Sequence, residues 1–176
     1  MIKQKNGQIW IETVLYTLIG LALIGAVMSF AYPKINETRE KILIEQTIAS
    51  LHAFDEVVRN VAERGPGNVR SFDMTLKKGS FIADGKSDKV SITINGLTKP
   101  YSEPGVEISN GPVTIKTEEG NQFFNVILIL NYGSNINITH EERDDSLTIS
   151  PSPTIYRLLV ENRGIGNNLI IVDIHE

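Results

Sequence analysis

This 176-residue chain has 21 Asp and Glu residues but only three histidines and no recognisable spacing for acid–base or metal chemistry. The three histidines, His52, His140 and His175, lack the short spacings at which His, Asp and Glu bind zinc. Cysteine is absent, which excludes disulfides, thiolate metal sites and cysteine nucleophiles. We therefore expect no bound metal and no cofactor, and we assign the histidines to packing or surface roles.

Two other segments have a composition that could serve a ligand. The acidic cluster Glu141, Glu142, Asp144 and Asp145 lacks the fixed ligand spacing and the turn glycine of a calcium loop, so it predicts a solvated loop. The segment 164–166, Gly-Ile-Gly, lacks the third glycine and the following helix of a nucleotide-binding loop, which predicts a turn. No nucleophile-elbow or kinase motif is present either. We expect that the chain is not an enzyme; an active site assembled from distant residues is the alternative.

One carboxylate stands in an unusual place. No charged residue occurs from Thr13 to Tyr32, and extending the run back to Ile9 adds only Glu12. A helix of 24 residues is about 36 Å long, enough to cross the hydrocarbon core of a bilayer. A carboxylate inside such a span costs about 2.5–3.5 kcal/mol and is usually paired. Glu12 is therefore either tolerated at the membrane interface or paired in a protein interior.

The chain divides into a basic leader (1–7), a long helix (8–64) and a strand-rich domain (68–176). The helix has an apolar half (8–32) and an amphipathic half (33–64), and Pro33 between them predicts a bend without a break. The leader carries Lys3 and Lys5 and no acid, which places it in the cytoplasm and the bulk of the chain outside. A net charge of −4 argues against nucleic-acid binding.

In the amphipathic half, apolar residues recur at steps of three and four, from Ile44 to Val61, and form one stripe. We predict that this stripe packs against the sheet. The segment Gly65-Pro66-Gly67 ends the helix, because glycine favours the C-terminal turn and proline cannot continue it.

Beyond Gly67 the apolar period changes to two, as expected for strands with one buried face. Asp84-Gly85 and Asn110-Gly111 predict hairpins. The segment 123–130 is apolar apart from Asn125, so it predicts a central strand covered on both faces. With strands over 147–149, 155–160 and 169–174, we expect seven to nine strands in an antiparallel β-sandwich-like domain, hence an α+β chain.

The residues around the start of the apolar run carry a resemblance. A basic tail ends in Gly7, Gln8 begins the apolar helix, and Glu12 is the fifth residue counted from Gln8. This pattern resembles the type IV prepilin signal and looks most like the archaeal class III signal peptide. The resemblance covers about 25 residues directly, and the layout of a long helix before a β-domain is similar to archaeal pilins over the whole chain.

The resemblance implies a surface filament subunit. A prepilin peptidase would cut between Gly7 and Gln8 on the cytoplasmic side, from a single-pass membrane precursor. An assembly ATPase and a membrane platform protein would then transfer the mature chain from lipid into a filament of identical or related subunits, serving roles such as adhesion. Cleavage would create a free amine on Gln8, and Glu12 would pair with that amine on a neighbouring subunit.

Other interpretations remain open. The chain could stay in the membrane as a minor pilin or as a surface β-sandwich binding protein. The segment 29–31, Ser-Phe-Ala, has the small-x-small form of an ordinary signal peptidase site, and cleavage there would release a secreted domain starting at Tyr32. Asn36 and Asn137 begin N-glycosylation sequons, which an extracellular location would make available.

Overall fold

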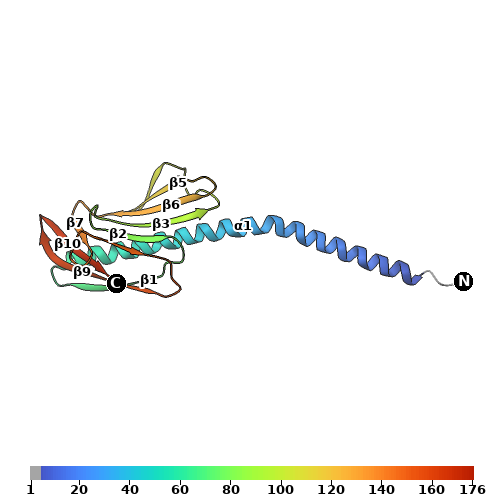
Figure 1. Ribbon diagram of the computed structural model, residues 1–176, viewed down its shortest axis with the longest axis horizontal. Helices are drawn as coiled ribbons and strands as arrows, with labels where there is room; N and C mark the ends of the chain where they lie inside the picture. The colour runs from blue at the N-terminus through green and yellow to red at the C-terminus, as the bar shows by residue number, and fades with distance from the viewer. Residues whose placement is uncertain (1–4) are drawn as a thin grey trace. The chain divides into compact units, whose positions relative to one another are not determined.

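The computed structural model describes residues 5–176, with side chains from Trp10 onward. One helix, α1 (Lys5–Glu63), precedes the strands (Figure 1). The architecture is the predicted α+β class, but the described chain has ten strands, more than the seven to nine expected. They are β1 (Val69–Met74), β2 (Ser80–Asp84), β3 (Lys89–Leu97), β4 (Glu107–Asn110), β5 (Val113–Glu119), β6 (Phe124–Asn131), β7 (Ile136–Thr139), β8 (Ser146–Ile149), β9 (Tyr156–Gly166) and β10 (Leu169–His175).

Helix α1 starts earlier than predicted and stops where predicted. It begins at Lys5, three residues before Gln8, and continues through Pro33. It ends at Glu63, and both following glycines have the positive φ that terminates a helix, 86° at Gly65 and 81° at Gly67. The chain forms two compact units that divide inside α1, between Glu40 and Lys41.

The second unit, residues 41–176, contains two sheets. The strand order is β1-β9-β10-β7 in one and β4-β5-β6-β3-β2-β8 in the other. All neighbouring strands are antiparallel except β7 and β10, which are parallel. In the view of Figure 1, β3, β5 and β6 lie on one side of the second half of α1, and β1 and β9 lie on the other.

The predicted helical stripe is buried, which confirms that part of the sequence analysis. Its members are Ile44, Ile48, Leu51, Phe54, Val58 and Val61, each 4% exposed or less. The Phe54 ring makes edge-on contacts with Phe72 of β1, at 5.3 Å between centroids, and with Phe81 of β2, at 5.8 Å. Because β1 and β2 belong to different sheets, the helix joins both sheets into one core.

The buried side chain of Asn162 in β9 fastens the end of α1 to the sheet. Its Nδ2 donates to the carbonyl oxygens of Val61 and Ala62, at 3.1 and 3.0 Å. Its Oδ1 accepts from the backbone N–H of Gly164, at 2.8 Å. Carbonyls in the last turn of a helix have no intrahelical partner, and Asn162 satisfies two of them.

Both predicted hairpins are present. Asn110 pairs with Val113 across a two-residue loop in which Gly111 has φ of 57°, and Asp84 pairs with Lys89 across the loop 85–88. The loop 85–88 also ties the sheets together, because the Asp88 carboxylate accepts from the backbone N–H of Ile138 in β7, at 2.9 Å.

Two sequence predictions about strands are wrong. Strand β6 is central, but it is not covered on both faces: Ile127 and Ile129 are only half-buried, and Phe123 lies outside the strand and is 51% exposed. Residues 164–166 form the end of β9 and not a turn. The chain reverses at Asn167 and Asn168, whose φ values of 49° and 68° suit a two-residue hairpin loop.

Candidate functional site

The most distinctive surface of the chain is the apolar part of α1. Large apolar side chains are exposed in every turn from Trp10 to Ile35, and Phe30 is 81% exposed. By length and composition this is the one helix among the described residues that could cross a membrane. An exposed apolar surface of this extent requires lipid or other protein to cover it.

Two hydroxyl groups within this segment are satisfied by the helix itself. Thr17 Oγ1 donates to the Thr13 carbonyl at 2.7 Å, and Ser29 Oγ donates to the Gly25 carbonyl at 2.9 Å. Such internal hydrogen bonds remove the cost of placing hydroxyl groups in hydrocarbon. The segment therefore suits both lipid and a dry helix–helix contact.

The residues of the predicted signal lie at the start of α1. Gly7 and Gln8 are within the helical backbone, but their side chains lie outside the described part of the structure. Glu12 is exposed and follows Gln8 by about one helical turn. The structure therefore places Gly7 and Gln8 next to each other in α1 and Glu12 about one turn further along.

The two sequons lie in regular secondary structure. Asn36 is in α1, and Thr38 Oγ1 of the same sequon donates to the Lys34 carbonyl at 2.9 Å. Asn137 is in β7, where Thr139 is buried and its Oγ1 donates to Asp173 Oδ1 at 2.7 Å. The hydroxyl of each sequon is thus already engaged in the folded chain.

The histidines all have hydrogen-bonding partners. His52 Nε2 lies 2.9 Å from the Asn110 carbonyl oxygen, His140 Nδ1 lies 2.8 Å from that of Ile174, and His175 Nδ1 lies 3.2 Å from Asp173 Oδ2. His52 thereby connects α1 to the β4–β5 hairpin. Across residues 10–176, no group of three or more His, Asp or Glu side chains is arranged to hold a metal ion.

The acidic cluster forms an exposed loop between β7 and β8. Arg143 pairs with both Glu141 and Asp145, at 3.6 and 3.9 Å, and Glu142 pairs with Arg163 at 3.0 Å. The two pairs of Arg143 lie within the loop, and the pair of Glu142 with Arg163 joins the loop to β9. All are largely exposed, so each contributes little to stability.

A buried carboxylate that the sequence analysis did not single out lies beside the apolar stripe of α1. Asp55 is 6% exposed, and its Oδ2 accepts from Arg59 Nε at 2.8 Å. This hydrogen bond raises the pKa of the Arg59 guanidinium. Tyr132 is also buried; its burial first, and then the nearby Asp55 carboxylate, raise the pKa of its phenol. The Oδ1 of Asp55 and the Tyr132 hydroxyl are both buried, and a hydrogen bond between these two side chains contributes to the raised pKa of Tyr132.

Asp55 lines an open groove between α1 and the β4–β5 hairpin. The groove has a volume of about 380 Å³, and its walls are His52, Asp55, Glu56, Arg59, Asn60, Glu63 and Pro112. Three of the lining side chains are carboxylates and one is an arginine. The groove is therefore acidic and rich in hydrogen-bond acceptors.

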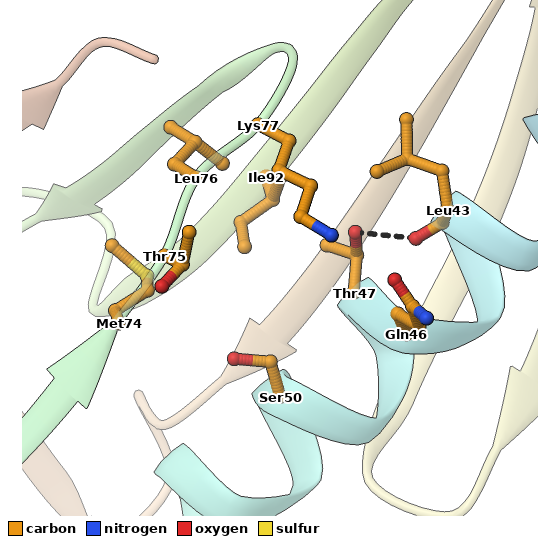
Figure 2. Close-up of a pocket in the computed structure, with 9 residues that line it drawn as sticks. All are labelled: Leu43, Gln46, Thr47, Ser50, Met74, Thr75, Leu76, Lys77 and Ile92. Atoms are coloured by element: carbon orange, nitrogen blue, oxygen red, sulfur yellow. Dashed lines mark hydrogen bonds between the residues drawn. The ribbon is translucent and has the colours of Figure 1, made fainter. Parts of the chain in front are cut away.

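A smaller pocket lies between α1 and the segment that follows β1 (Figure 2). It has a volume of about 60 Å³ and is lined by Leu43, Gln46, Thr47, Ser50, Met74, Thr75, Leu76, Lys77 and Ile92. Lys77 is the single charged residue of the lining, and Figure 2 shows its side chain extending toward the helix. The lining of this pocket thus combines hydroxyl, amide and ammonium groups with apolar side chains.

Sequence reasoning missed both surface depressions, although one signal was present. Asp55 interrupts the apolar stripe directly after Phe54, and Arg59 follows it by four residues, the spacing of a helical ion pair. The hairpin residue Pro112 and the loop residue Lys77 are distant in sequence, so their approach to α1 depends on the order of the strands. That order is not encoded in any local pattern.

Comparisons with known proteins identify no relative of this chain. No family model matches the sequence, and the searches of curated proteins and of solved structures return no match. The chain's own residues and geometry are therefore the basis for its function.

Proposed function

We propose that the chain is a structural subunit of an archaeal type IV pilus-like surface filament. In this proposal the apolar half of α1 holds the precursor in the membrane, and a prepilin peptidase removes residues 1–7. An assembly ATPase and a platform protein then move the mature chain into a filament. There the apolar helices of identical or related subunits pack together, and the β-domain faces outward.

The observation that carries the proposal is the exposed apolar surface of α1 between Trp10 and Ile35. It is long enough for a membrane, and the hydroxyl groups of Thr17 and Ser29 are bonded within the helix, which suits both lipid and a helical core. The prepilin-like residues Gly7, Gln8 and Glu12 at its start favour a filament over a permanent anchor.

The size of the second unit supports an outward-facing domain. Residues 41–176 contain their own apolar core, to which α1 and both sheets contribute. Such a unit stays folded when the apolar half of α1 changes its surroundings. This independence supports a role for the domain as a surface module in the proposed filament.

Mass spectrometry of the mature N-terminus in the native host tests the proposal. We expect the mature chain to begin at Gln8. An N-terminus at Tyr32 would indicate a secreted domain, and an intact Met1 would indicate a membrane-anchored protein. Electron microscopy of the cell surface in a strain with the gene deleted is the companion experiment, and the loss of a filament is expected.

Cleavage itself should depend on Gly7. The peptidase must reach the bond after Gly7, and a β-branched residue there would crowd the bond and restrict the backbone. Gly7→Val should therefore leave the precursor uncut, which gel mobility and intact mass would detect. Ile2→Val is the matched control and should be cut normally; an equally processed Gly7→Val chain would count against a prepilin-type signal.

A further inference from the structure

The acidic groove on α1 is lined by three carboxylates and one guanidinium, so its carboxylates outnumber its cations. Asp55 accepts a hydrogen bond from Arg59 Nε and lies beside the buried Tyr132 hydroxyl, whereas Asn60 Oδ1 is buried without a hydrogen-bond partner among the described residues. Glu56 and Glu63 are exposed and form no ion pair with another described residue. The groove therefore favours a ligand that carries positive charge and donates hydrogen bonds.

The pocket beside Lys77 has the opposite character. Its lining contains no carboxylate, and Lys77 is exposed and forms no ion pair with any residue the structure describes. Thr75 and Ser50 add hydroxyl groups, and Gln46 adds an amide. Lys77 is thus available to a carboxylate from outside the chain.

The two depressions are related by the geometry of α1. Each helical residue of the Lys77 pocket precedes a residue of the acidic groove by nine positions: Leu43 and His52, Gln46 and Asp55, Thr47 and Glu56, Ser50 and Arg59. Nine residues make about two and a half turns, so the depressions lie on opposite sides of α1, offset by about 13.5 Å along its axis. Lys77 consequently faces away from the groove of its own chain.

We propose that Lys77 of one copy enters the acidic groove of a second copy, between the exposed carboxylates Glu56 and Glu63. This inference rests on the proposed filament. Complementary surfaces on opposite sides of one molecule make a heterologous contact, which repeats without closing and so builds a helical array. With parallel helices, the contact shifts neighbouring copies by about 13.5 Å along α1.

Paired cysteine substitutions test the contact, because the natural chain has no cysteine. The full chain carrying both Lys77→Cys and Glu63→Cys is assembled and treated with a short bismaleimide cross-linker. A linker is preferable to a disulfide because paired lysine and glutamate side chains keep their Cα atoms further apart than a disulfide allows. The matched control carries Lys89→Cys, an exposed lysine on β3, with Glu63→Cys.

The expected result is a ladder of covalent products that increases by one chain per step and extends beyond dimers. Each single cysteine variant should give dimers at most, since a heterologous contact needs both positions. Filaments that form but give no more ladder than the Lys89→Cys control would overturn the inference and leave the filament intact. Failure of the cysteine-free parent to form filaments would overturn the proposed function itself, and this inference with it.

Charge reversal gives an independent readout. Lys77→Glu or Glu63→Lys alone should raise about tenfold or more the subunit concentration at which filaments form, because each places like charges in contact. The double variant should restore most of the loss. Equal defects in the double and single variants would contradict a direct contact.

Discussion

At the scale of single residues, Asn162 connects the end of α1 to β9 through two hydrogen bonds, and a third joins it to Gly164 within β9. Asn162→Ala would leave two buried carbonyls and one N–H without partners, so we expect the free energy of unfolding to fall by about 3 kcal/mol. Chemical denaturation of the full chain in a mild detergent measures it. The control Asn121→Ala, at an exposed position, should change the free energy of unfolding by less than about 0.5 kcal/mol. Equal losses for the two variants would show that the hydrogen bonds of Asn162 contribute little to stability.

Asp84 gives a prediction about pH. Hydrogen bonds from Ser87 Oγ, at 2.6 Å, and from Ser146 and the Lys86 backbone hold the pKa of the Asp84 carboxyl below its usual value. Because the folded-state pKa lies below the unfolded value of about 3.9, the stabilisation is present at neutral pH and is lost as pH falls through the folded-state pKa.

Asp84→Asn should accordingly lower the free energy of unfolding at about pH 7 and have a much smaller effect near pH 2, where the natural carboxylate is also neutral. Denaturant titrations at the two pH values test this. Asp144→Asn, in the exposed acidic loop, should show no such dependence. A penalty for Asp84→Asn that is the same at both pH values would show that the carboxylate's charge is not responsible.

Single residues also show what a sequence can predict about this site. Glu12 is recognisable because a charge in a membrane-length apolar run is unusual. The partner of His52 is not recognisable, because Asn110 lies 58 residues away and approaches only after β4 and β5 form a hairpin. The same reason hides the acidic groove, whose second wall is Pro112.

At the scale of elements, Phe54 is the contact through which α1 holds both sheets. Phe54→Ala should reduce the free energy of unfolding by about 3–5 kcal/mol, the usual cost of a large core truncation. Phe123→Ala is the control, since Phe123 is 51% exposed, and should cost less than about 1 kcal/mol. A loss below about 1 kcal/mol for Phe54→Ala would place the stripe outside the stabilising core.

The elements that the sequence predicts correctly are those with strong local signals. The stripe of α1 has a helical period, and the hairpins carry Asn-Gly or Asp-Gly. Strand β4 has no buried face, because all four of its residues are exposed, so only the Asn-Gly signal that follows it indicates a strand there. Strand β6 misleads because its apolar residues alternate between a buried face and a half-buried outer face that no second layer covers.

At the scale of the whole molecule, Glu12 is expected to act in assembly. Glu12→Gln should leave the β-domain stable and cleavage largely intact but should sharply reduce filament number. The substitution leaves the Gln8 amine of a neighbouring copy without its counter-charge, and losing one partner of a buried pair costs about 3–5 kcal/mol. Electron microscopy and a sedimentation assay measure the filaments.

Glu103→Gln, in an exposed loop of the β-domain, is the matched control and should assemble normally. Mixed expression with the natural chain separates the roles further: a Glu12→Gln chain that is cleaved and membrane-resident but incorporated poorly supports pairing. Filaments of normal number and length from Glu12→Gln alone would argue instead for a membrane-anchored binding protein.

The buried hydrogen bond between Thr139 and Asp173 has a consequence for timing. Thr139 supplies the hydroxyl of the Asn137 sequon, and that hydroxyl becomes inaccessible once β7 pairs with β10. These strands lie 30 residues or more apart in sequence, and non-local pairing of this kind is slow. Glycan transfer to Asn137 would therefore require the Thr139 hydroxyl before β7 pairs with β10, so a glycan at Asn137 would have been added while this part of the domain was still unfolded.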